Sequence, residues 1–188
     1  MNIETAEKEL TKTNEVRDKL LSEKRLVIRK CALGIRAVHT EDYGKAHEQL
    51  KEAKKMMGKL EEKTKKHPEL TGTLNTPYQE IVELEVLLGV IENGEIPEVD
   101  APPDAYLTGV LDAIGEMKRV VISYLMKGED EKASELYDKM EETYYSMEGF
   151  AFPNSLVNGF KHKQDIMKRV LERLYETLAE TKIRDRKH

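Results

Sequence analysis

Glu80 and Glu83 lie among apolar residues in the stretch "YQEIVELEVLLG", residues 78–89. The apolar residues recur at helical spacing, and on a helix Glu80 and Glu83 would point about 60° apart. Leu84 and Leu87 fall on the same arc, so the two carboxylates belong to the side of the helix that faces other protein. A carboxylate in that position is costly unless it is paired, hydrogen-bonded or bound to a metal ion.

A second acidic pair lies in "GVLDAIGEMKR", residues 109–119. Asp112 and Glu116 are four residues apart, so both point to one face of a helix. Gly109 and Gly115 border this face, and their missing side chains leave room for another helix or a ligand. By itself an acidic pair at this spacing is typical of a solvated face or of a salt bridge.

Taken together, the two acidic pairs indicate more specific chemistry. Successive helices with a short linker are expected to be antiparallel neighbours, which would bring three or four carboxylates together. Such a cluster repels itself at neutral pH unless it holds a cation or keeps some carboxyls protonated. Oxygen ligands suit Mg²⁺ or Mn²⁺, and many nucleases use such ions to activate water and stabilise the leaving oxygen. The alternative is that the acidic residues pair with Lys or Arg of another helix.

Three arginines form a basic stripe on the first predicted helix. By the helical period, Arg25, Arg29 and Arg36 fall within about 40° of one another, and His39 lies beside them. Such a line is suited to following a phosphate backbone. The alternative is that these arginines pair with some of the chain's 36 Asp and Glu residues. The lysine-rich run "KEAKKMMGKLEEKTKK", residues 51–66, is interpreted as a solvated face.

Other kinds of site are not indicated. Cys31 is the only cysteine, which excludes an intrachain disulfide and a CxxC site, and its apolar surroundings indicate a core position. The five histidines form no HxxxH or HExxH pattern, and neither a glycine-rich phosphate loop nor a GxSxG elbow is present. The formal net charge of −5 does not favour a generic basic nucleic-acid binder, although it is compatible with a local basic stripe.

Helical spacing predicts six helices to position these residues. Their approximate limits are 3–39, 40–66, 77–92, 104–127, 130–147 and 155–182, and residues 183–188 are expected to fray. Thr40 is expected to cap the second helix. Thr76 is expected to cap the third, with Pro77 in its first turn and Gln79 completing a capping box.

The composition agrees with a helical protein. The 188 residues are 36% charged and 39% hydrophobic and include no Trp, which favours a single all-α domain over residues 1–188, a bundle of six to seven helices. At about 1.5 Å per residue the first and last helices would exceed about 40 Å, and apolar stripes of that length favour homo-oligomerisation. Neither a signal peptide nor a membrane span is indicated, so we expect a cytoplasmic protein.

The stretch "DAYLTGVLDAIGEMKR", residues 104–119, resembles the central helix of the translin family, in particular of its Trax branch. "YQEIVELEVLLG" lies where that branch has its Glu-x-x-Glu. "RKCALGIRAVHT", residues 29–40, resembles the family's first helix, and "KRVLERLYETL", residues 168–178, its closing helix. The resemblance covers most of the chain, in the right order.

This resemblance implies an all-α fold, assembly into a hollow octamer, and binding of single-stranded RNA or DNA inside it. Trax-type subunits are metal-dependent endoribonucleases. Carried over by position, Glu80, Glu83 and Asp112 would hold Mg²⁺ or Mn²⁺, and Glu116 would be a further ligand or a base. Asp112 is the discriminating position, because translin-type chains have no acid there.

The resemblance also places the family's basic interior surface on residues of the first helix. The corresponding residues are Arg25, Arg29 and His39. We add Arg36 because it belongs to the same arginine stripe. This chain is shorter than most relatives before its first helix. Its last helix carries a different arrangement of basic residues, around Lys161 and Lys163.

We therefore expect a metal-dependent endoribonuclease that acts on single-stranded or structured RNA within a hollow homo-oligomer. One alternative is a translin-like oligomer that binds single-stranded RNA or DNA without catalysis. A further alternative is a purely structural helical scaffold.

Overall fold

The computed structural model describes residues 1–185, and in this range every regular element is a helix. The order is α1 (Ile3–His39), α2 (Tyr43–Thr64), the 3₁₀ helix η1 (Pro68–Leu74), α3 (Asn75–Asn93), α4 (Pro103–Lys127), α5 (Asp130–Glu148) and α6 (Phe160–Asp185). The predicted all-α bundle is confirmed. None of the described helices is long and apolar enough to cross a membrane.

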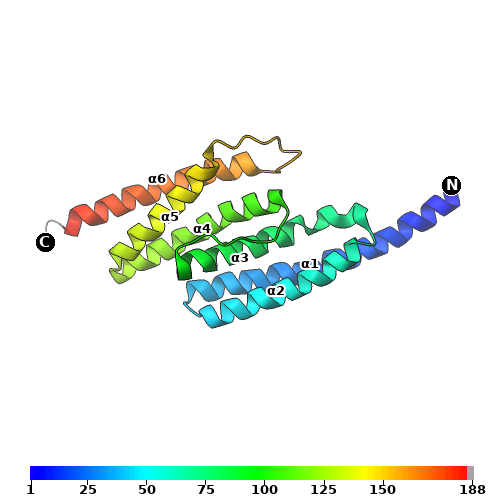
Figure 1. The fold of residues 1–188 in the computed structure, drawn as a ribbon, viewed down its shortest axis with the longest axis horizontal. Helices are drawn as coiled ribbons and strands as arrows, with labels where there is room; N and C mark the ends of the chain where they lie inside the picture. The colour runs from blue at the N-terminus through cyan, green and yellow to red at the C-terminus, as the bar shows by residue number, and fades with distance from the viewer. Residues whose placement is uncertain (186–188) are drawn as a thin grey trace.

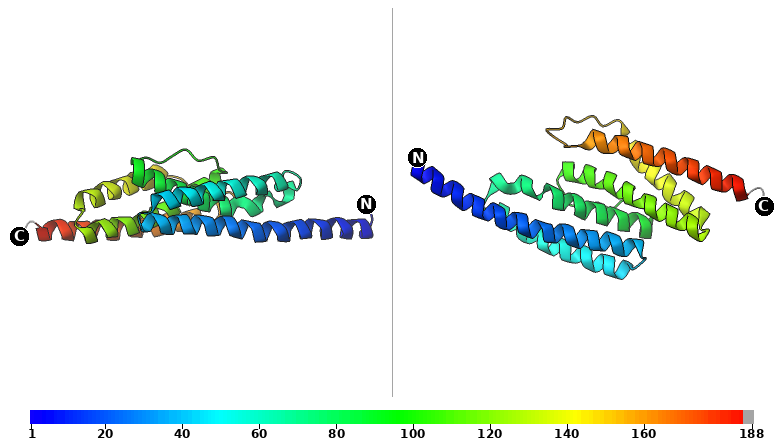
Figure 2. Two further views of the ribbon diagram at one scale, coloured as in Figure 1. Left: turned by 90° about the horizontal axis from the view of Figure 1, so that it is seen from below. Right: turned by 180° about the vertical axis from the view of Figure 1, so that it is seen from behind.

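The helices lie in three consecutive pairs (Figure 1). α1 and α2 form one edge, α3 and α4 the middle, and α5 and α6 the other edge. α4 contacts α3, α5, α6 and α1, so residues on α4 meet side chains from both halves of the chain. The N-terminal part of α1 extends beyond the other helices at one end, and the last part of α6 extends at the opposite end (Figure 2).

The buried stripe of α1 shows which part of this long helix belongs to the core. Leu20, Val27 and Cys31 are fully buried, and their spacing repeats one face of a helix. Near its start, in contrast, Ile3 is 89% and Leu10 is 70% exposed. The core contacts of α1 therefore begin about halfway along it, and its first turns carry apolar side chains that no residue in the described range 1–185 covers.

α3 and α4 approach each other unusually closely at Gly109. A Cβ atom added there would lie 2.6 Å from the carbonyl oxygen of Gln79 and 2.7 Å from the Cβ of Val82. Only a glycine allows this approach. Because Asp112 lies one turn after Gly109, and Glu80 directly follows Gln79, this contact sets the register in which the two acidic pairs meet.

Two predicted helix caps are wrong. Thr40 ends α1, where its backbone N–H donates to carbonyl groups of the last turn, and α2 is capped instead by Asp42, whose side chain accepts from the Lys45 N–H at 3.1 Å. Thr76 lies inside α3, which has no side-chain cap. The reason is that η1 leads directly into α3, so no residue with extended backbone precedes it.

α6 begins at Phe160 rather than near residue 155. The preceding segment turns, and it ends at Gly159 with a φ of 73°, which interrupts a helix. α6 is about 39 Å long at about 1.5 Å per residue, slightly shorter than predicted, whereas α1 reaches about 55 Å. The expected fraying is wrong for residues 183–185, which are helical; residues 186–188 lie outside the described part of the chain.

Gly109→Ala is expected to destabilise the fold, because the new methyl group meets the rigid backbone of α3. Overpacking of this kind costs about 1–3 kcal/mol, partly offset by the better helix propensity of alanine, about 1 kcal/mol. Thermal unfolding should show a melting temperature lower by several degrees.

Gly58→Ala is the matched control. It lies within α2, and apart from its chain neighbours and the nearby backbone of that helix, no described atom lies within 4 Å of an added Cβ. The same propensity gain should therefore raise stability by about 0.5–1 kcal/mol. Equal stabilisation by both substitutions would contradict the close α3–α4 contact.

Candidate functional site

The structure brings the four predicted carboxylates together between α3 and α4. Glu80, Glu83, Asp112 and Glu116 are all partly buried. The negative charges of the other three all act on Glu83. The two acidic pairs recognised in the sequence therefore form one cluster.

Burial and mutual repulsion change how these carboxyl groups ionise. The pKa of Glu83 is raised to about 8, first by burial and then by the charges of Glu80, Asp112 and Glu116. The pKa of Glu80 is also raised, by burial and then by Asp112. Cys31 packs into the core beside them, and its pKa is raised to about 12 by burial and by both glutamates. The cluster thus has more negative charge than its surroundings balance, and Glu83 holds a proton at neutral pH.

Asp112 is held from two sides. Its Oδ1 accepts a hydrogen bond from the Lys163 ammonium group of α6, and its Oδ2 accepts one from the Gln79 amide at 2.6 Å. The side-chain oxygen Oε1 of Gln79 in turn accepts from the Thr108 hydroxyl at 3.1 Å. α3, α4 and α6 therefore all contribute to the orientation of this carboxylate.

Sequence reasoning missed both partners of Asp112. It assigned Gln79 to a helix cap, and for Lys163 it noted only that the basic residues of the last helix are arranged differently from those of the translin family. The position of Gln79 directly before Glu80 was a usable signal, because it places an amide on the same helix as the acidic pair. No comparable signal existed for Lys163, which is 51 residues away from Asp112.

Glu116 has a different environment from the other three carboxylates. Its Oε2 lies 2.5 Å from the Nε2 of His39, and a weaker ion pair joins it to Arg119 at 3.5 Å. The hydrogen bond from His39 is the main cause that lowers the pKa of Glu116, so this group is ionised beside the protonated Glu83. His39, predicted to contact nucleic acid, is only 10% exposed in its side chain and links α1 to α4.

The donor atoms of the cluster suit a hard divalent cation, although they do not form a preformed cage. Within residues 1–185, no three His, Cys, Asp or Glu side chains are arranged to hold a metal ion. Glu80 and Glu83 have no ion-pair partner among the described residues. Among residues 1–185, only Lys163 brings an ammonium group to these carboxylates, where positive charge is needed. The sequence left open that the acidic residues pair with Lys or Arg of another helix. This pairing is found for Asp112 and not for Glu80 or Glu83.

The basic stripe of α1 is connected to this cluster through His39, which contacts Glu116. Arg25, Arg29 and Arg36 are all exposed, and in the part of the chain that the structure describes none of them forms an ion pair. They point away from the buried side of α1. His39 lies about 60° round the helix from Arg36, so the stripe borders the side of α1 that contacts Glu116.

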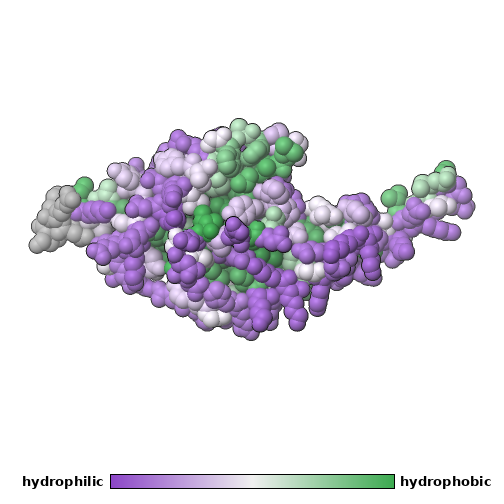
Figure 3. All heavy atoms as spheres, in the orientation of Figure 1, coloured by the Kyte–Doolittle hydropathy of each residue, from purple (hydrophilic) through white to green (hydrophobic). Residues whose placement is uncertain are grey.

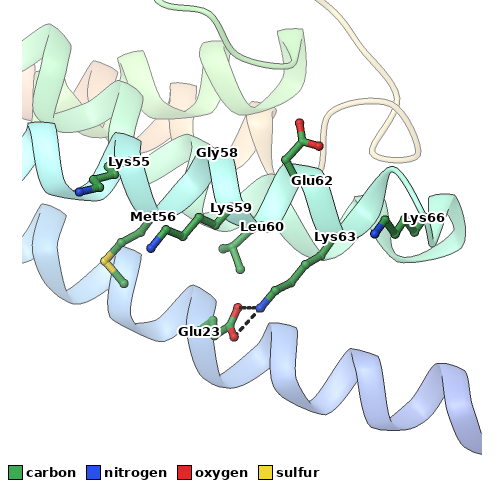
Figure 4. Close-up of a pocket in the computed structure, with 9 residues that line it drawn as sticks. All are labelled: Glu23, Lys55, Met56, Gly58, Lys59, Leu60, Glu62, Lys63 and Lys66. Carbon is green, nitrogen blue, oxygen red and sulfur yellow. Dashed lines mark hydrogen bonds and ion pairs between the residues drawn. The ribbon is translucent and has the colours of Figure 1, made fainter.

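A second basic surface lies in a groove of about 690 Å³ beside α2 (Figure 4). Four lysines and two glutamates line it together with Gly58 and two apolar side chains; the residues are Lys55, Lys59, Lys63, Lys66, Glu23, Glu62, Gly58, Met56 and Leu60. The Lys63 ammonium group forms an ion pair with the Glu23 carboxylate of α1, while the other three lysines are exposed. None of the clustered carboxylates lines this groove, so it is a separate surface.

Comparison with known proteins gives relatives over nearly the whole chain. Residues 43–185 match the Translin family. An uncharacterized protein of Methanocaldococcus jannaschii is 32% identical over 177 residues, which covers 88% of this chain and 76% of that protein.

Solved structures show the same fold. The crystal structure of AfC3PO has a TM-score of 0.89 and 27% identity, covering 97% of this chain and 98% of that one. The complex of AfC3PO with duplex RNA also has a TM-score of 0.89, with 28% identity and coverage of 97% of both chains. Apo-NeC3PO, at 22% identity, has a TM-score of 0.84 over 96% of this chain and 97% of that one, which shows the shared fold. With the family match and the identity to the archaeal relative, these comparisons show that this chain belongs to the translin family.

Proposed function

We propose that this protein is a Trax-like endoribonuclease that depends on Mg²⁺ or Mn²⁺ and cleaves single-stranded or structured RNA. The observation that carries this proposal is the cluster of four carboxylates between α3 and α4, whose charges act on one another. A fold that only needed to be stable would gain by placing neutral groups there. The duplex RNA bound to the similar AfC3PO supports RNA as the substrate.

Glu80, Glu83 and Asp112 would hold the metal ion. When bound, the ion supplies an activated water molecule and offsets the charge of the phosphodiester. Loading requires Glu83 to release its proton, since a protonated carboxyl is a poor ligand. Gln79 keeps Asp112 in orientation through the 2.6 Å hydrogen bond to Oδ2.

Glu116 is suited to a different task. Its pKa is lowered by the hydrogen bond from His39, so it stays ionised where Glu83 does not. We assign it either to the metal or to accepting a proton from the attacking water. His39 fixes its orientation from α1.

The arginine stripe would bind the phosphates that flank the cleaved bond. Arg25, Arg29 and Arg36 are exposed and form no ion pair within the described residues. Their charge is therefore available to a polyanion. His39 would complete this binding surface at its edge towards Glu116.

We further propose that the protein works as a homo-oligomer, an octamer, that encloses the RNA. Apolar side chains gather over the loop between α5 and α6 (Figure 3), where Phe150 and Phe152 are 41% and Leu156 is 65% exposed. Exposed apolar surface of this kind typically marks contact with another protein surface. Light scattering that gave the mass of a single chain, 21.6 kDa, would contradict this assembly.

The competing proposal is an RNA-binding oligomer without catalysis. It is favoured by the pairing of Asp112 with Lys163 and by the absence, within residues 1–185, of a group of three side chains arranged for a metal. Both proposals use the arginine stripe to bind RNA, and only the nuclease proposal includes cleavage of the RNA.

Asp112→Asn tests the nuclease directly. Wild-type protein is expected to cleave a fluorescent RNA, single-stranded or hairpin, with Mg²⁺ or Mn²⁺ and not with EDTA. The variant keeps the size of the side chain and loses its charge, so the rate should fall at least about a hundredfold.

Asp138→Asn is the matched control, because Asp138 is exposed on α5 and should not affect cleavage. Failure of well-assembled wild-type protein to cleave would leave the non-catalytic oligomer. Cleavage that survives Asp112→Asn would place the activity at another site.

The double variant Arg29→Gln with Arg36→Gln should bind RNA oligonucleotides more weakly in EDTA. The slope of log affinity against log salt concentration should decrease by about one for each phosphate that the variant no longer neutralises. Fluorescence anisotropy at several salt concentrations measures both quantities. Lys55→Gln with Lys59→Gln, in the groove of Figure 4, changes the net charge equally and should leave the slope unchanged. The opposite ranking would place the RNA along α2.

Glu83→Gln should change how stability depends on pH. The pKa of Glu83 is about 8 in the folded chain, against an ordinary 4.5. Between these values the folded chain binds the proton more tightly than the unfolded chain. The free energy of unfolding therefore falls as the pH rises through this window, by up to about 1.4 kcal/mol per pH unit from this group.

In EDTA, Glu83→Gln should therefore be more stable than wild type at pH 8, and this advantage should disappear as the pH approaches 4.5. Melting temperatures across this range measure the difference. Glu48→Gln, at an exposed position of α2, should follow wild type. Parallel curves for wild type and Glu83→Gln would contradict the raised pKa.

A further inference from the structure

Lys163 is held in place at the edge of the acidic cluster. It lies in the first turn of α6, which starts after Gly159, and its backbone N–H donates to the Gly159 carbonyl at 3.0 Å. The next residue, Gln164, is 1% exposed and donates to the Met147 carbonyl at 2.8 Å. The start of α6 is therefore anchored to α5, and the Lys163 side chain, 27% exposed, reaches from a fixed position to Asp112.

The two oxygens of Asp112 have partners of different kinds. Oδ2 accepts from the neutral amide of Gln79, and that amide is itself held by Thr108. Oδ1 accepts from the charged ammonium group of Lys163. Each carboxylate oxygen has two lone pairs, so a metal ion can join Gln79 on Asp112 without replacing it. A divalent ion and an ammonium group at the same oxygen, however, repel each other.

Lys163 is also the only Lys or Arg among the described residues that pairs with Glu80, Glu83 or Asp112. Its charge favours ionisation of both glutamates. It thus partly replaces the positive charge that the cluster lacks.

We propose that Lys163 is the built-in counter-cation of the acidic cluster, and that a divalent metal ion binds by displacing its ammonium group from Asp112. This inference rests on the proposed function and adds a positioning residue to it. Lys163 stabilises the metal-free protein and lowers the affinity of the cluster for metal. Gln79 holds Asp112 in both states.

Mn²⁺ binding to RNA-free protein tests this role without reference to catalysis. The electron paramagnetic resonance signal of free Mn²⁺ gives the dissociation constant. Lys163→Met should bind Mn²⁺ about tenfold more tightly than wild type, which corresponds to about 1.4 kcal/mol. In EDTA the melting temperature of Lys163→Met should be lower than that of wild type. Addition of Mn²⁺ should raise the melting temperature of Lys163→Met by more than it raises that of wild type.

Two control variants separate charge from packing. Lys163→Arg keeps the positive charge and should retain the affinity of wild type. Lys161→Met removes a lysine that pairs with Asp165 within α6 at 3.1 Å, and it should change neither quantity. Asp112→Asn added to Lys163→Met should remove the gain in affinity, because the gain depends on this carboxylate.

The outcomes distinguish this inference from the proposed function. Equal or weaker Mn²⁺ binding by Lys163→Met, with wild type that binds and cleaves, would overturn only the role of Lys163. Absence of Mn²⁺ binding in both proteins would overturn the inference together with the metal dependence. A gain that survives Asp112→Asn would place the ion elsewhere and would also overturn the inference.

Discussion

The close contact of α3 with α4 at Gly109 is the constraint on which the candidate site depends. A Cβ atom there would meet the Gln79 carbonyl oxygen at 2.6 Å, so any other residue would separate the two helices. Through this contact, Gln79 reaches both Thr108 and Asp112, and Glu80 and Glu83 face the acids of α4. A change of register by one residue would turn one of the acidic pairs away.

Clustering the carboxylates works against the stability of the bundle. The raised pKa values of Glu80 and Glu83 mean that burial and repulsion disfavour their charged forms. Groups that cost stability in this way are typical of functional sites. The surrounding helices tolerate this cost because most of α3 is apolar and buried. In addition, Lys163 of α6 supplies a positive charge beside Asp112, and His39 of α1 hydrogen-bonds Glu116.

Much of the fold was predictable because it depends on local patterns. The limits of α1, α4 and α5 follow from helical spacing and from turn residues such as Gly128, which ends α4 in the left-handed conformation. Predictions failed where neighbouring structure competes with a local signal. Thr40 and Thr76 are good N-capping residues by type. Thr40, however, forms the C-terminal end of α1, and Thr76 follows directly on η1 and lies inside α3. The late start of α6 follows from Gly159.

The sequence by itself determined the helices, their apolar faces and the two acidic pairs, because each is a periodic pattern within one segment. It also carried the resemblance to the translin family, which the comparisons confirm. Only the tertiary structure decided which groups surround each carboxylate. Lys163 approaches Asp112, and His39 approaches Glu116, across 51 and 77 residues of chain. Such partners are chosen by how the helices pack, and the spacing of residues along the chain does not record that packing.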